Sequence, residues 1–266
     1  MKNSTIIGLI LGLVAVLGGM VLKGAKLSFL LNPAAFSIII LGTIAAVMIA
    51  FPMSELSKVG KLFKIVFTEQ PLPPREQLIG QFMEWASITR REGLLALEAK
   101  VDEIEDSFLR NGMRMIIDGN DQDLVRDVLL EDISATEERH KTGALIFTQA
   151  GTYAPTLGVL GAVVGLVAAL ADMSDMNKLA YAIAGAFIAT LLGIFTGYVL
   201  WHPIANKLKR KSKQEIQVKL MMLEGLLAIQ SGVSTIAINQ KLSVFLTPTE
   251  RQKLREKEER GGEEKA

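Results

Sequence analysis

The stretch LIFTQAGTYAPTLGVLGAVVGLVAALA, residues 145–171, holds 27 residues and no Asp, Glu, Lys or Arg. As a helix rising about 1.5 Å per residue, it is longer than the roughly 30 Å hydrocarbon core of a bilayer. Residues 5–22, 34–51 and 179–203 lack the same four residue types. The sequence therefore predicts four transmembrane helices and an all-α integral membrane protein.

The predicted spans are also informative for what they lack. A membrane protein that moves ions alone normally carries an ionisable group inside the bilayer, where such groups are costly and kept for transport. The four spans contain no acidic residue. This pattern disfavours a transporter that acts alone.

The distribution of charge predicts the topology. Residues 52–144 hold 12 Lys/Arg and 18 Asp/Glu, and the chain after residue 203 holds 13 and 8. The connections 23–33 and 172–178 hold only Lys23, Lys26 and Lys178 as basic residues. Because basic residues near span ends favour the cytoplasm, both termini and the large insert are predicted to be cytoplasmic.

These expectations pair the four spans as two hairpins and divide the chain into ten segments. They are a cytoplasmic N-terminus (1–4), helix 1 (5–22), an outer loop (23–33), helix 2 (34–51), a cytoplasmic helical insert (52–144), helix 3 (145–171, whose inner part extends toward the cytoplasm), an outer loop (172–178), helix 4 (179–203), cytoplasmic helices (204–248) and a charged, disordered tail (249–266).

Within the cytoplasmic segments, apolar periodicity predicts further helices. We expect an amphipathic helix at the membrane surface over 55–68, a break at Pro71, Pro73 and Pro74, and turns at 111–112 and 118–120. Helices are expected over 78–91, 94–110, from 121 to the third span, over 206–231 and over 234–245.

Small residues recur at intervals of four in spans three and four. Such stripes allow helix backbones to approach closely in lipid. They suit either packing within one hairpin or contact with another copy or a partner helix, and the sequence leaves both open. The residues are Gly161, Gly165, Gly185, Ala189, Gly193 and Gly197.

Three residues of these spans can affect the helix backbone. Pro155 lies inside span three, where a proline removes a backbone hydrogen bond and permits a kink. Pro203, at the inner end of span four, suits a simple helix end. Thr190 is a polar side chain in the middle of span four, and its hydroxyl can either bond back to the i−4 carbonyl or line a narrow wet path.

The insert contains the charged sequence RREGLLALE, residues 90–98. If this segment is helical, Arg90 and Glu98 lie roughly 12 Å apart along the axis, too far to pair with each other. Arg90, Arg91 and Glu98 are then either a solvated helix surface or a contact with a charged partner.

Other chemistry is disfavoured. There is no cysteine, and His140 and His202 have no third metal ligand nearby in the sequence. No phosphate loop, nucleophile motif or carboxylate pair is present, so an enzyme, a cofactor and a nucleic-acid partner are not expected.

Seven sequence motifs resemble the flagellar motor stator subunit MotA, in the MotA/TolQ/ExbB proton channel family. They occur in the family's order and spacing across nearly the whole chain. The motifs are RREGLLALE, DSFLRNGMRMIIDG, DLVRDVLLEDI, TYAPTLGVLGAVVGLVAAL, GAFIATLLGIFTGY, WHPIANKL and EGLLAIQSGVS.

The resemblance implies a homo-oligomeric ring of five such subunits around two copies of MotB in the bacterial cytoplasmic membrane. MotB would carry the ion-binding aspartate, and ion flow would turn the ring against the rotor protein FliG. By motif, Arg90 and Glu98 match the rotor-facing charges, with Arg91 as a helper. Pro155 and Pro203 match the coupling prolines, and Thr190 the pore-facing threonine.

The resemblance also bears on the ion. Sodium-driven relatives tend to carry a threonine at the position of Ala162, and a methyl group cannot replace water around Na⁺. Ala162 therefore favours H⁺ over Na⁺. The rival interpretations are an energiser that resembles TolQ and ExbB, which typically have three spans, and a membrane scaffold that conducts no ions.

Overall fold

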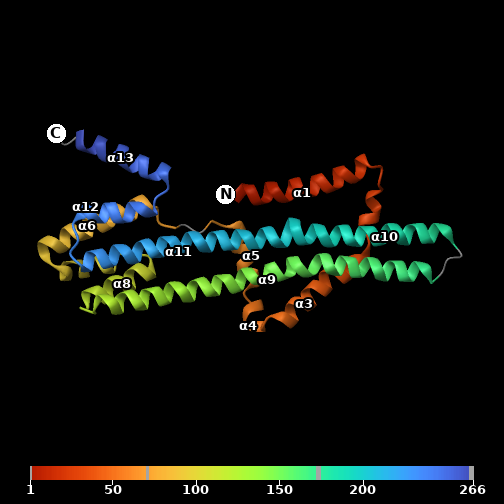
Figure 1. Ribbon diagram of the computed structural model, residues 1–266, viewed down its shortest axis with the longest axis horizontal. Helices are drawn as coiled ribbons and strands as arrows, with labels where there is room; N and C mark the ends of the chain where they lie inside the picture. Colours follow the sequence, from red (N-terminus) through yellow and green to blue (C-terminus); the bar gives the residue numbers. More distant parts are fainter. Residues whose placement is uncertain (1, 70–71, 172–174, 264–266) are drawn as a thin grey trace. The chain divides into compact units, whose positions relative to one another are not determined.

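In the computed structural model, the chain is described over residues 2–69, 72–171 and 175–263, and every regular element there is a helix (Figure 1). Four helical segments of the described residues are long and apolar enough to cross a membrane. They are Ser4–Leu22, Leu27–Ala50, Gln122–Leu170 and Met176–Gln230. The all-α class and the four spans are thus confirmed. The expected outer loop 172–178 lies partly outside the described residues, and Pro71 lies outside them altogether.

The chain divides into two compact units. Unit 1 comprises Met1–Gln70 and Arg139–Lys211, and unit 2 comprises Pro71–Glu138 and Ser212–Ala266. Two continuous helices contribute to both units: α9 (Gln122–Leu170) and α11 (His202–Gln230). The sequence predicted both of these helical extensions beyond the third and fourth spans.

Unit 1 holds the membrane spans. Its α10 begins where the Asp175 side chain accepts from the backbone N–H of Asn177 at 2.9 Å, and α2 begins at Pro33 after the Asn32 cap. The elements are α1 (Lys2–Leu22), η1 (Leu27–Leu30), α2 (Pro33–Phe36), the π-helix η2 (Ser37–Leu41), α3 (Gly42–Ala50), α4 (Met53–Leu56), α5 (Val59–Phe67), α10 (Met176–Phe195) and the π-helix η4 (Thr196–Trp201).

The amphipathic helix α5 turns its apolar side toward its own chain. Val66 is fully buried, and the Phe63 ring lies 5.1 Å from that of Phe147 and 6.1 Å from that of Trp201. A helix held on a membrane by its apolar face would leave that face to the lipid. The apolar residues of α5 therefore pack within unit 1. The expectation that this apolar face rests on the membrane surface is thus corrected.

Unit 2 has a conventional hydrophobic core. Phe82 is fully buried, with its ring 5.5 Å from that of Trp85, and it packs where Gly225 of α11 carries no side chain. The further elements of this unit are α6 (Arg75–Glu92), η3 (Leu94–Leu97), α7 (Glu98–Val101), α8 (Ser107–Ile117), α12 (Thr235–Leu242), η5 (Ser243–Phe245) and α13 (Pro248–Glu263).

The segment 94–110 is not the single helix that its periodicity predicts. Gly93 has φ 86° and ψ 169°, a backbone conformation that ends α6, and only short helical turns follow. A new helix, α8, begins where the Asp106 side chain accepts from the N–H of Leu109 at 2.9 Å. The turn expected at 111–112 is also wrong, because Gly112 lies inside α8 and its missing side chain admits Leu226.

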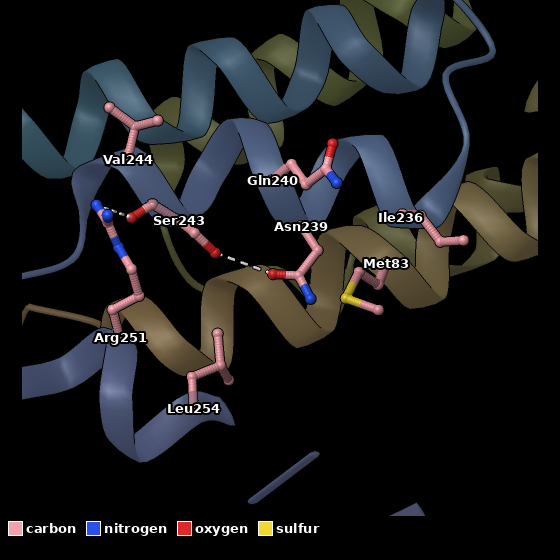
Figure 2. Close-up of a pocket in the computed structure, with 8 residues that line it drawn as sticks. All are labelled: Met83, Ile236, Asn239, Gln240, Ser243, Val244, Arg251 and Leu254. Atoms are coloured by element: carbon pink, nitrogen blue, oxygen red, sulfur yellow. Dashed lines mark hydrogen bonds between the residues drawn. The ribbon is translucent and has the colours of Figure 1, made fainter. Parts of the chain in front are cut away.

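The C-terminal tail differs from the disordered segment expected over 249–266, because residues up to Glu263 form α13. Thr247 and Glu250 form a capping box: the Thr247 N–H donates to Glu250 at 2.7 Å and the Glu250 N–H to Thr247 Oγ1 at 3.3 Å. Figure 2 shows the groove of about 600 Å³ beside α13, with Arg251 donating to the Ser243 carbonyl.

Neutralising Glu250 is expected to loosen α13. The Thr247 N–H holds the pKa of the Glu250 carboxyl below its usual value of 4.5, and Arg75 at 3.9 Å acts in the same direction. Because the folded pKa is lowered, this stabilisation is complete above pH 4.5 and is lost as the pH falls through the folded pKa. Glu250→Ala should cost about 1 kcal/mol, seen as a roughly fivefold faster amide exchange in α13.

Glu256→Ala is the matched control, since Glu256 lies in the same helix and accepts only from the exposed Gln252 side chain. Equal exchange rates in the two variants would show that the capping box does not hold α13.

Candidate functional site

The backbones of α9 and α10 are in direct contact where both helices carry glycine residues. A Cβ added at Gly193 would lie 2.8 Å from both the Ala154 carbonyl oxygen and the Gly158 Cα. A Cβ added at Gly158 would meet the Ala189 carbonyl oxygen at 2.8 Å. Distances under 3 Å to backbone atoms leave no room for any side chain. This crossing therefore requires glycine on both helices.

The predicted small-residue stripes have neighbours within the same chain. Gly161 faces the Ala189 methyl group at 3.4 Å and Gly165 faces that of Ala186 at 3.7 Å, measured from an added Cβ. Gly185 faces the Asn32 amide at 3.1 Å. The geometry thus favours packing within one chain for these positions. A role in contacts with other chains stays a prediction.

Pro155 lies in this crossing. An added Cβ on Gly197 would lie 2.7 Å from Pro155 Cγ and 2.8 Å from the Gly151 carbonyl oxygen. Since proline has no N–H, that carbonyl lacks its usual donor four residues later. The proline and the uncovered carbonyl both face the glycine of the neighbouring helix, at a point where α9 is able to bend.

Pro203 does not end its helix as the sequence suggested, because α11 runs from His202 to Gln230 through it. The preceding turn, Thr196–Trp201, is a π-helix. Pro203 cannot donate to the carbonyl of Val199, which explains a widened turn directly before it. Pro155 and Pro203 therefore each mark an altered backbone bond in a long helix.

The hydroxyls of the spans are mostly bonded locally. Thr190 is half-buried, and its Oγ1 lies 3.4 Å from the Ala186 carbonyl, the back-bond that the sequence allowed. Ala162 is half-buried on α9. Thr43 was missed: it is buried in α3, and within the described residues its hydroxyl has no hydrogen-bond partner. Only the fold could reveal this, since threonine normally bonds to its own helix.

The two histidines lie on the helices α9 and α11. His202 packs against Gly151, and its ring lies 5.3 Å from that of Tyr198. No group of three or more potential ligands occurs in the part of the chain that the structure describes.

The charged residues of the insert surround a tight turn. Arg90 and Arg91 lie in the last turn of α6, and Glu98 begins α7. All three are exposed, as is Leu95 at 70%. The turn at Gly93 means that the separation along a single straight helix, estimated from the sequence, does not apply.

These three charges have no ion-pair partner among the described residues, whereas their neighbours are paired. Lys100 donates to Glu84 at 3.0 Å, and this carboxylate raises the pKa of the Lys100 ammonium. Arg114 contacts Asp102 at 3.0 Å. The turn thus presents two positive charges, the negative charges of Glu92 and Glu98, and an apolar side chain to solvent, as a surface suited to a charged partner.

Comparisons with known proteins agree along the chain. Residues 100–221 match the MotA/TolQ/ExbB proton channel family, and residues 6–93 match the Motility protein A N-terminal family. The chain is 54% identical to Motility protein A of Bacillus subtilis over 266 residues, which cover 100% of this chain and 98% of that one.

Two solved structures are similar. The flagellar MotAB stator complex of Bacillus subtilis contains a chain with 55% identity and a TM-score of 0.88, covering 94% of this chain and 98% of that one. C. jejuni MotAB gives 31% identity and a TM-score of 0.87, covering 93% and 97%. The chain therefore belongs to the MotA/TolQ/ExbB proton channel family.

Proposed function

We propose that this chain is the stator subunit of a bacterial flagellar motor, and that it forms a membrane ion channel with a MotB-type partner. The observation that carries this proposal is the similarity to Motility protein A and to a MotAB stator complex over nearly the full length of the chain. The channel converts ion flow into rotation and torque, a role that is not enzymatic.

The partner supplies what this chain lacks. By sequence, the four spans contain no acidic residue to bind the ion. Both similar structures are described as assemblies of MotA with MotB. A multimeric ring of this chain around MotB, whose own helix carries the acid, accounts for both observations. Five copies around two MotB chains is the stoichiometry that the resemblance implies.

The membrane arrangement follows from charge. We place both termini, the insert and the C-terminal helices on the cytoplasmic side of the bacterial inner membrane, and the connections 23–33 and 172–178 outside, with the spans in two hairpins. The basic residues that follow the fourth span support this orientation, because positive charge near span ends is retained in the cytoplasm.

Ion passage is coupled to movement at the glycine crossing. Each H⁺ that crosses the membrane releases about 2.3 kcal/mol per 100 mV, several times the thermal energy. Pro155 and Pro203 lie where backbone bonds are missing, so these helices can bend without breaking further bonds. Thr190 lies on α10 near this crossing and faces the path. Ala162 offers no oxygen to Na⁺, which supports H⁺ as the ion.

Torque passes to the rotor protein FliG through the exposed turn between α6 and α7. Arg90, Arg91 and Glu98 are its charged contacts. Their exposure, and the absence of ion-pair partners among the described residues, support this assignment.

The alternative is an energiser of the cell envelope that resembles TolQ and ExbB. The match of residues 6–93 to the Motility protein A N-terminal family favours the motor. Complementation distinguishes the two roles. In a non-motile strain lacking both stator subunits, this chain together with its MotB-type partner should restore swimming, and neither chain should do so alone. If the pair reaches the membrane and swimming is not restored, the motor function is contradicted.

A further inference from the structure

Unit 1 contains an apolar cavity of about 370 Å³ between α3, α5 and α9. Val47, Ile146 and Ala150 are buried in its wall and pack together. Its lining begins at Thr43 on α3 and continues through Met53 and Leu56 of α4 to Ser57. The volume of the cavity is typical of ligand sites.

The cavity is reached from the side of a membrane span. Ile44, Met48 and Met53 line it and are 50%, 52% and 66% exposed. Ile44 and Met48 belong to the apolar span Leu27–Ala50, so within a bilayer this opening faces hydrocarbon rather than water. The surrounding bilayer therefore supplies hydrocarbon chains that can enter the cavity.

Positive charge lies at the end of the cavity where the span stops. Lys58 directly follows Ser57, and Lys61 lies one helical turn further along α5. Both side chains are exposed, and neither has an ion-pair partner among the described residues. The apolar side of α5 is buried in protein, so its lysines remain available to an external anion.

The surrounding segments of unit 1 also carry a net positive charge. Residues 52–69, 139–144 and 203–211 together hold nine Lys/Arg and two Asp/Glu. Basic residues near span ends are expected in any cytoplasmic flank. That rule does not account for an apolar cavity whose lining residues Ser57 and Val59 flank the unpaired Lys58, with the unpaired Lys61 in the first turn of α5. Basic pockets between membrane helices are the kind of site that binds anionic lipid headgroups.

We propose that this cavity binds an acyl chain of an anionic phospholipid, with its headgroup phosphate against Lys58 and Lys61. The lipid would fill the space between α3, α5 and α9. This site depends on the insertion of the chain in a membrane and not on the rotor contact, so the failure of either proposal leaves the other standing.

Retention of lipid by the intact complex tests the site. The complex with the MotB-type partner is placed in nanodiscs of equal phosphatidylglycerol and phosphatidylethanolamine, delipidated gently and weighed by native mass spectrometry. The wild type should retain phosphatidylglycerol preferentially. Its retention should fall about 30-fold in Lys58→Gln/Lys61→Gln, the ratio for two attractions of about 1 kcal/mol each.

Lys23→Gln/Lys26→Gln is the control, because it removes the same charge from the connection 23–33 and should retain the lipid. Met48→Trp narrows the opening and should reduce retention of both lipids, whereas Leu160→Phe, at an exposed position on α9 outside the cavity, should not. The mass of the protein assembly reports in every variant whether the complex still forms.

Three results would overturn the proposal. One is equal retention of the two lipids by the wild type, and another is unchanged retention in both Lys58→Gln/Lys61→Gln and Met48→Trp. The third is a disulfide cross-link between two copies, which a single introduced cysteine can report because the chain has no cysteine of its own. If Met48→Cys forms a disulfide between two copies in the membrane, a second copy covers the opening and the site is not a lipid site.

Discussion

Gly193→Ala is expected to abolish swimming and to prevent assembly with the MotB-type partner. The added methyl group would lie 2.8 Å from the Ala154 carbonyl oxygen and 2.8 Å from the Gly158 Cα. Both are backbone atoms, so α9 and α10 must move apart. In a helix, glycine to alanine is normally favourable by about 1 kcal/mol, and here the overlap should reverse that sign at a cost of about 1–3 kcal/mol or more.

Thermal unfolding of the purified complex and swimming speed measure these effects. Gly19→Ala is the control, because nothing lies within 4 Å of a Cβ added there, and it should swim like the wild type. Normal assembly and stability in Gly193→Ala would contradict the direct backbone contact between the two helices.

Reversing charge at the exposed turn of the insert should have the second large effect. Arg90→Glu and Glu98→Lys should each reduce swimming severely and leave the amount of protein in the membrane unchanged. Both residues are exposed and lie outside the hydrophobic core, so folding is not expected to suffer. Placing like charges against the rotor costs several kcal/mol of binding.

Lys253→Glu serves as the matched control, since this exposed residue of α13 carries the same charge far along the chain from the turn. Reversal of the complementary charge on FliG should restore swimming to Arg90→Glu. Wild-type swimming by both reversal variants would remove Arg90 and Glu98 from the rotor contact.

The sequence was sufficient to predict those parts of the fold that depend on the composition of long segments. Apolar stretches without charge specify spans in a bilayer, because each backbone polar group must be satisfied inside its own helix. α9 and α11 were predicted to extend beyond their spans for a different reason, because helical periodicity continues through residues 121–142 and 206–230 without a proline.

Local interruptions of the helices were harder to predict, because they depend on tertiary contacts. Gly93 and Gly112 are both glycines in helical patterns, yet Gly93 ends a helix through its positive φ and Gly112 lies inside a helix against Leu226. The π-helix of residues 196–201 has a visible cause in Pro203, whereas no proline follows the π-helix of residues 37–41 as closely.

The candidate site was predicted only in part. The stripe of Gly193 and Gly197 was visible in the sequence, but its partner surface was not, because closeness of two backbones is a property of the fold. The charges of RREGLLALE were likewise visible, but the turn at Gly93 that presents them was not. The unpaired hydroxyl of Thr43 gave no signal at all.

The most direct test is the swimming speed of cells that carry this chain and its MotB-type partner as their sole stator, measured against sodium concentration and against a protonophore. The proton-driven motor predicts a speed that is independent of sodium and falls to zero when the protonophore collapses the proton gradient. A speed that rises with sodium and survives the protonophore would contradict it.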